Sequence, residues 1–523
     1  MNTWLVEFGR LIFIWVLLLS LGVAEVRAAD FGVFEAQLDI GSVQKPGSAV
    51  FDAAANSYVV SGSGENMWFT NDACHMVWRR MSNDFSLSAA VEWVNAGGNA
   101  HRKACLIVRQ TVEPDAPYVD VAIHGNGLVS LQFRATPGGM THEIQARQPE
   151  PASGAQGAPG TLTFGLQRQG DVFFLTAPDA SGKFVPQGAF TRLRFTDPVY
   201  VGLAVCAHDA KAIESARFSH LALQAETARA EAKAVLHCAL ETVAINSHDR
   251  RLRYHTTDLI EAPNWTRDGR FFLFNSGGHM FRLPAGGGAP ERIDTGAAHR
   301  CNNDHGLSPD GTQLAISDQS QDGKSRIYVL PSAGGAPRLI TPLAPSYWHG
   351  WSPDGSTLAY CAERDREFDV YTIPVQGGQE TRLTSAPGLD DGPDYSPDGK
   401  FIYFNSERSG SMQIWRMHPD GTHQEQVTAD DFNNWFAHPS PDGRWLVFLS
   451  YARDVKGHPA NQAVRLRLLA LDGAGHPVRG ALPANQAIID LAELFGGQGT
   501  INVCSWSPDS REVAFVSYEL IRP

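Results

Sequence analysis

Acidic side chains recur at fixed distances upstream of a tetrapeptide turn that the second half of the chain repeats six times. Glu261 and Asp391 each lie five residues before a copy of this turn, and Asp304 and Asp394 lie close by in sequence. Two carboxyl groups that face one pocket can act as acid and base in glycoside cleavage. We therefore predict these four residues as catalytic candidates. The alternative is that acidic residues near turns only cap backbone groups.

Amide and aromatic side chains occupy upstream positions in the other repeats. This mixture suits a saccharide, because sugar hydroxyls bond amides while sugar ring faces pack on aromatic rings. Arg408 would hold the carboxylate of a uronate, as would Arg300, Arg364 and Arg453, unless these arginines are simply solvated. The other predicted substrate-binding residues are Asn303, Tyr347, Trp348, Asn434, Trp435 and Asn502.

Three histidines precede the turns of the second, third and fifth repeats. Neutral imidazoles of His305, His349 and His438 would suit one divalent metal ion, and Gln498 would add an oxygen ligand. We predict Mn or Ca. The set resembles that of the oligogalacturonate lyases, propeller enzymes that hold manganese with three His and one Gln, although that family has seven blades. The alternative is that these histidines satisfy buried backbone groups.

The repeat determines the elements that must position these residues. The turn lies at 266–269, 308–311, 352–355, 396–399, 440–443 and 507–510, at intervals of 42, 44, 44, 44 and 67 residues. Most copies read Ser-Pro-Asp-Gly, in which Pro presets φ, Asp bonds its own backbone and Gly takes positive φ. An apolar strand follows each copy. Four short strands in a period of about 40–45 residues are typical of a propeller blade.

The sixth copy leaves room for only two strands. The missing outer strands are predicted at 241–246 and 251–255, so that pairing of the N- and C-terminal strands closes a six-bladed β-propeller over residues 236–523. These repeats resemble the TolB-like propeller family. The resemblance implies the fold and leaves the function open, because that fold serves scaffolds, lyases and peptidase accessory domains.

Residues 30–225 show short runs of alternating apolar and polar residues without a helical period. This pattern predicts a β-sandwich, so the whole protein is expected to be all-β. Around 124–127 and 201–208 the sequence resembles the concanavalin-like jelly-roll family, a fold that often binds sugars. Residues 226–235 are predicted as a linker with helical character, and the Pro- and Gly-rich segment 149–160 as a surface loop.

The 523 residues include 43 basic and 56 acidic side chains, a formal charge of −13, and no basic run. This balance argues against a nucleic-acid partner. Residues 1–29 are typical of a secretory signal peptide, and no second long apolar stretch follows. We expect a periplasmic or secreted protein without a membrane span after cleavage, a retained anchor being the weaker alternative. The seven widely spaced cysteines indicate neither a disulfide scaffold nor a thiolate zinc site.

The 67-residue interval between the last two turns is 23 residues longer than the 44-residue period. Within it, 486–495 is predicted as a short amphipathic helix, which would form a lid or wall over the channel mouth. The alternative is that this long segment between blades is only decoration. The leading hypothesis is an exported carbohydrate-binding protein that processes a saccharide at the propeller mouth, as a lyase or a glycoside hydrolase, while the sandwich binds or positions the glycan. The alternative is a non-catalytic TolB-like periplasmic scaffold or binding protein with a protein partner.

Overall fold

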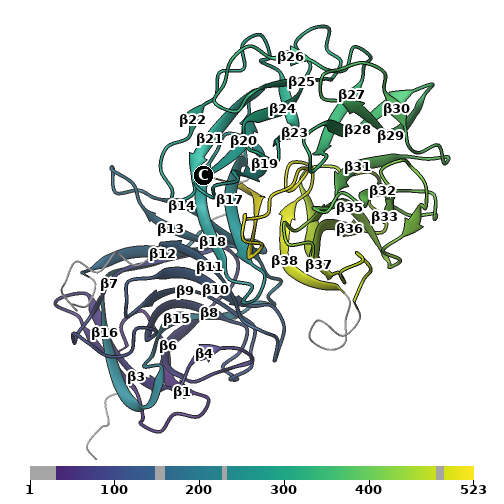
Figure 1. Ribbon diagram of the computed structural model, residues 1–523. Helices are drawn as coiled ribbons and strands as arrows, with labels where there is room; N and C mark the ends of the chain where they lie inside the picture. The colour runs from purple at the N-terminus through teal and green to yellow at the C-terminus, as the bar shows by residue number, and fades with distance from the viewer. Residues whose placement is uncertain (1–30, 148–159, 227–232, 479–487, 523) are drawn as a thin grey trace, which may run out of the picture.

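The computed structural model describes residues 31–147, 160–226, 233–478 and 488–522, and these residues are all-β (Figure 1). Two large sheets come mainly from the N-terminal half, and small sheets form a ring in the C-terminal half. The predicted signal peptide and nearly all of the predicted loop at 149–160 lie outside the described residues. Among the described residues, no helix is long and apolar enough to cross a membrane.

The N-terminal half forms two layers and a short hairpin, β4 (Met67–Trp68) with β5 (Asn71–Asp72). The seven-stranded layer has the order β14 (Phe184–Arg192), β13 (Val172–Pro178), β12 (Leu162–Gln169), β7 (Phe85–Trp93), β16 (Asp209–Ala225), β3 (Ser57–Gly64) and β2 (Ser48–Asp52). The other layer begins with β1 (Ala36–Ile40), β6 (Cys74–Met81), β15 (Val199–Cys206), β8 (Lys103–Arg109), β9 (Tyr118–His124), β10 (Val129–Arg134) and β11 (His142–Arg147).

Apolar side chains at every second position of these strands form the core between the two layers. Leu106 and Val121 of one sheet and Leu87 and Leu166 of the other are fully buried in a single apolar cluster. Successive side chains of a strand point to opposite faces, so each sheet contributes every second residue to this core. The two layers therefore form the predicted β-sandwich.

Five four-stranded antiparallel sheets form the blades of the C-terminal half, and in each the first strand along the chain starts the order. These are β19 (Ile260–Trp265), β20 (Phe271–Ser276), β21 (His279–Pro284) and β22 (Glu291–Arg292); β23 (Cys301–Leu307), β24 (Gln313–Asp318), β25 (Arg326–Pro331) and β26 (Arg338–Leu339); β27 (Ser346–Trp351), β28 (Thr357–Arg364), β29 (Glu367–Pro374) and β30 (Thr381–Arg382); β31 (Asp390–Tyr395), β32 (Ile402–Ser406), β33 (Gln413–Met417) and β34 (Glu425–Gln426); β35 (Phe432–Pro439), β36 (Trp445–Ala452), β37 (Gln462–Ala470) and β38 (Ile488–Gly496).

The repeated turn joins the first two strands of each blade. In the third blade, the Ser352 hydroxyl donates to Asp354 Oδ1 at 2.6 Å and accepts from the backbone N–H of Thr357 at 2.9 Å. Gly355 has φ +71°, a conformation that favours glycine. The serine, aspartate and glycine of the repeat therefore each have a structural role in this turn.

The predicted pairing of N- and C-terminal strands is confirmed. The strand β17 (Val235–Ala244) lies between β18 (Arg250–Thr256) and β39 (Glu512–Ile521), antiparallel to both. Strand β17 begins at Val235, which is the last residue of the predicted linker. The sequence did not predict that β18 also pairs in parallel with β11, so the three strands continue the large sandwich layer into one ten-stranded sheet.

Side chains reinforce this connection between the two halves. Arg192 Nε donates to Glu519 Oε2 at 2.9 Å, and Glu519 is almost fully buried. His237 and His255 stack with ring centroids 5.1 Å apart, and the edge of Phe190 packs against both rings. The sandwich and the propeller therefore share both a backbone ladder and a packed interface.

The predicted helix at 486–495 is wrong. Residues 488–496 form β38, which pairs with β37 along its length as the outer strand of the fifth blade. The neighbouring strand offers a complete row of backbone partners, and this tertiary pairing overrides the amphipathic helical pattern. The segment therefore completes a blade rather than forming a lid.

Candidate functional site

The inner strands of three blades carry bulges at equivalent positions. The register shifts between Glu261 and Asn264 in β19, and β31 and β35 shift in the same way. The bulged residues Ala262, Gly392 and Phe436 have φ values of 54°, 63° and 54°. Only glycine adopts this conformation without strain, so the other two positions cost roughly 1 kcal/mol each. Such bulges re-aim the neighbouring side chains, here those of Glu261 and Asp391.

Asp391 is held ionised at the channel. His349 Nε2 donates to its Oδ1 at 3.1 Å, and the backbone N–H of Gly392 donates to the same oxygen at 2.7 Å. Burial alone would raise the pKa of Asp391, but the hydrogen bond and charge of His349 outweigh burial and lower it to about 2. Burial would likewise lower the pKa of His349, but Asp391 raises it.

The pKa of Asp304, which lies near Asp391 and His349, is shifted in the opposite direction. Asp304 is 5% exposed, and burial raises its pKa to about 7, although His349 acts in the other direction. The charges of Asp391 and Glu261 raise the pKa of Asp304 further, so the three carboxyl groups lie near one another. Burial also raises the pKa of Glu261, whose Oε2 accepts a hydrogen bond from Asn275 Nδ2 at 3.0 Å. Carboxyl groups with pKa values pushed apart are the usual arrangement of an acid–base site.

His458 belongs to this cluster and was not predicted from the sequence. It lies in the loop between β36 and β37, with its Nε2 3.9 Å from Asp391 Oδ2. Its Nδ1 donates to Gln498 Oε1, and its ring packs against Trp435 with centroids 4.5 Å apart. This loop is not part of the repeat, so alignment of the repeats could not identify His458. The only sequence signal was the presence of a histidine in the loop.

Three of the four predicted metal ligands, His349, His438 and Gln498, have separate partners. Both nitrogens of His438 are engaged, Nδ1 with Asp394 Oδ2 at 3.0 Å and Nε2 with the carbonyl of Ile501 at 2.8 Å. The Gln498 oxygen accepts from His458, and the fully buried His305 has its pKa lowered by burial to about 4. Within the ranges that the structure covers, no group of three or more His, Cys, Asp or Glu residues is arranged to hold a metal ion.

The predicted substrate-binding residues fall into two groups. Asn303 and Tyr347 lie beside the carboxyl cluster. The Asn303 side chain hydrogen-bonds Glu261. The pKa of Tyr347 is raised mainly by burial, and the nearby charges of Asp304 and Asp391 raise it further. Trp348 and Trp435 are buried aromatic residues of inner strands, and Asn502 Oδ1 accepts from the backbone N–H of Gly499 at 2.7 Å.

Asn434 and Arg408 have structural partners instead. Asn434 is fully buried, and its amide donates to Gln413, Thr428 and Asp430 while its oxygen accepts from Ser450. Arg408 donates to Asp390 Oδ2 at 2.7 Å and packs over the Trp415 ring. Neither side chain is free for a ligand.

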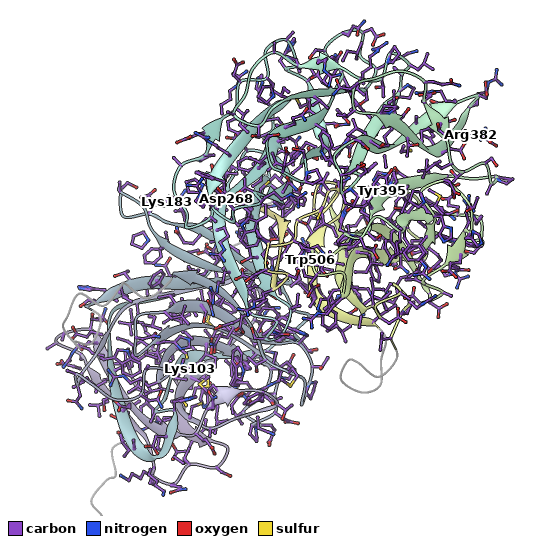
Figure 2. All side chains as sticks on the ribbon, in the orientation of Figure 1. Lys103, Lys183, Asp268, Arg382, Tyr395 and Trp506 are labelled. Carbon is purple, nitrogen blue, oxygen red and sulfur yellow. The ribbon has the colours of Figure 1, made fainter. Side chains whose placement is uncertain are left out.

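A cavity of about 280 Å³ lies at the turn end of the inner strands. Prolines of the repeated turns line it together with Trp351, Tyr395 and Asp394, and His349 reaches it as well. Figure 2 shows Tyr395 and Trp506 within the propeller. Asp394, one of the four predicted catalytic residues, therefore faces this cavity and pairs with His438.

The sandwich contains a second group of buried polar side chains. Lys103, labelled in Figure 2, donates to Asn66 Oδ1 at 3.0 Å and packs over the Trp68 ring. Asp120 nearby is fully buried, and burial raises its pKa to about 7 despite the opposing charge of Lys103. A cavity of about 980 Å³ lies beside the β4–β5 hairpin.

Comparisons with known proteins agree with this architecture. The family described as the TolB beta propeller domain matches residues 342–467. The chain is 50% identical over 281 residues to the uncharacterised protein Atu1656 of Agrobacterium fabrum, covering 54% of this chain and 92% of that protein.

Solved structures give the same result. A structure assigned as TolB from Agrobacterium tumefaciens shares 49% identity at a TM-score of 0.51, over 55% of this chain and 99% of that chain. An oligogalacturonate lyase with manganese shares 14% identity at a TM-score of 0.33, over 55% and 91% of the two chains, a likeness too low to bear on chemistry. The chain therefore belongs to the TolB-like family of PD40 β-propellers and carries in addition an N-terminal region of large β-sheets.

Proposed function

We propose that this is an exported carbohydrate-binding protein that cleaves a saccharide at the propeller channel, with Glu261, Asp304 and Asp391 at the reacting centre. The observation that carries the proposal is the juxtaposition of Asp391, whose pKa is lowered to about 2, and Asp304, whose pKa is raised to about 7. At neutral pH one group is a carboxylate and the other retains its proton for about half the time. Such a pair can accept and donate protons within one catalytic cycle.

The roles follow from the surroundings of each group. Asp304 in its neutral form would protonate the leaving glycosidic oxygen, because burial favours the protonated state. Asp391 would act as base or nucleophile, oriented by the hydrogen bond from His349. Glu261 and Tyr347 are half-buried and would contact the sugar ring.

A matched set of variants tests this proposal. Purified protein is incubated with acidic, neutral and amino polysaccharides while reducing ends and unsaturated sugars are measured separately. Reducing ends alone indicate hydrolysis, and unsaturated products indicate a lyase. Asp304→Asn and Asp391→Asn should each reduce turnover by about a hundredfold or more, whereas Asp431→Asn on the exposed rim should leave it unchanged.

The same assay decides the alternative, a TolB-like binding or scaffold protein without catalysis. The 49% identity to a protein assigned as TolB favours this second function. Binding of a saccharide or protein partner without any product from the polymers would contradict the proposed enzyme and support the scaffold.

We also propose a sixth blade and the bounds of the domains. We assign β39, β17 and β18, with the inner segment at 500–506, as a sixth blade; the bridge between Trp506 and Val513 supports this. We assign the sandwich at 30–225 as a concanavalin-like jelly roll, 226–235 as the linker and 236–523 as the propeller. Removal of residues 1–29 on export would leave the protein periplasmic or secreted.

A further inference from the structure

Three of the four arginines predicted to hold a uronate already form ion pairs with carboxylates of their own. Arg364 Nε donates to Glu380 Oε1 at 2.8 Å, Arg408 Nη2 to Asp390 Oδ2 at 2.7 Å, and Arg453 Nη1 to Asp431 Oδ1 at 2.8 Å. A guanidinium that is paired with a carboxylate has little remaining attraction for a second anion. These residues therefore do not provide the predicted grip on a uronate.

The site itself is rich in acceptors. Glu261, Asp304 and Asp391 gather around it, and among the described residues no Lys or Arg forms an ion pair or hydrogen bond with any of the three. Asn275 adds an independent observation. Its amide donates to Glu261, but its carbonyl oxygen has no hydrogen-bond partner although the residue is only 3% exposed.

An unpaired buried acceptor beside a carboxylate calls for a donor from the ligand. A positively charged ligand would supply the missing donor and a countercharge for Glu261, whereas Asp391 already faces His349 and His458. The half-buried ring of Tyr347 lies near Asp304 and Asp391 and suits an organic cation.

We propose that the ligand of the channel site carries a protonated amine, and that its saccharide substrate is an amino sugar whose nitrogen is not acetylated. The amine would donate to Glu261 and to the unpartnered oxygen of Asn275, with Asp391 contributing charge. This inference rests on the proposed function for the saccharide part, whereas the preference for an ammonium group follows from the acceptors alone.

Calorimetric titration with three probes of matched ring size tests the inference. The probes are glucosamine oligomers, their N-acetylated counterparts and galacturonic acid oligomers. We expect the glucosamine oligomers to bind about tenfold or more tightly than either of the others. Added salt should weaken this binding, because screening reduces the attraction between charges.

Three variants and one control locate the effect. Glu261→Gln and Asn275→Leu should each weaken binding of glucosamine oligomers by about tenfold, with little change for the N-acetylated probe. Asp431→Asn removes one negative charge from the exposed rim and should change neither. Thermal melting of each variant shows whether it is folded, and Asn275→Asp, which keeps an acceptor, should retain the preference.

The outcomes separate the two proposals. Equal or tighter binding of the N-acetylated or galacturonate probes, or no binding of glucosamine oligomers, would overturn the ammonium inference, and turnover of one of those polymers would still support the enzyme. Selective binding of glucosamine oligomers with no product from any polymer would sustain the inference and overturn the proposed catalysis.

Discussion

Replacement of Asp304 by Asn should stabilise the protein above neutral pH. Asp304 is almost fully buried beside Asp391 and Glu261, and its pKa is raised from 3.8 to about 7. The folded protein therefore binds a proton that the unfolded chain releases. Asn has nearly the same shape and no charge, so the variant removes the ionisation without removing the hydrogen-bonding side chain.

The size of the effect follows from that pKa difference. Below about pH 3.8 the carboxyl is neutral in both states and costs nothing. As pH rises toward about 7, stability is lost progressively, and above it the loss reaches about 4 kcal/mol, from about three pKa units at 1.36 kcal/mol each. Asp304→Asn should recover most of this free energy at about pH 9 and little at about pH 4.

Denaturant unfolding of wild type and variant at several pH values measures the difference. Asp120→Asn is a parallel case in the sandwich, because the pKa of Asp120 is also raised to about 7 by burial. Asp431→Asn, on the exposed rim, controls for the loss of one negative charge. If the stability gain of Asp304→Asn is the same at about pH 4 and about pH 9, the reasoning from burial is refuted.

Three further predictions concern the interface and the blades. Arg192→Ala should destabilise the protein by about 1–3 kcal/mol, measured by denaturant unfolding, because it leaves the buried Glu519 carboxylate without its ion-pair partner; an unchanged midpoint would show that solvent replaces the arginine. His255 has its pKa lowered to about 4 by burial, so stability should fall as pH drops from about 6.5 through about 4, and His255→Phe should flatten that dependence in a thermal-melting series. Gly306→Ala should cost about 1–3 kcal/mol because its Cβ would lie 2.1 Å from the Trp348 ring, whereas Gly286→Ala, with open space around it, should cost far less; equal melting temperatures would contradict this packing.

The repeated turn made the propeller predictable from sequence. Ser, Pro, Asp and Gly each have a local role in the turn, so the period of strands could be counted without knowing any long-range contact. The parallel pairing of β11 with β18 could not be predicted, because it joins backbone groups and carries no side-chain pattern. The helical pattern at 486–495 failed for a related reason, since β37 supplied backbone partners that the segment alone does not reveal.

The candidate site was predictable in part. Alignment on the turn identified Asp391, His349 and Glu261, because equivalent positions of successive blades lie around the same channel. It missed His458, which lies in a loop without a repeat. It also misread Asn434, whose amide donates to Gln413, Thr428 and Asp430. The sequence predicts the position of a side chain along the channel, but it does not reveal which residues will form hydrogen bonds with that side chain.

The ten-stranded sheet implies an order of assembly. The hairpin of β17 and β18 can pair with β11 before any of the five four-stranded blades has been synthesised, so the sandwich would offer a fixed docking edge while those blades are made. The ring closes only when β39, residues 512–521, reaches that edge. Loss of this strand would leave one edge of β17 unpaired, and an open strand edge can pair with another chain, a known route to aggregation. The pairing of both edges of β17 thus depends on the strand made last among those described.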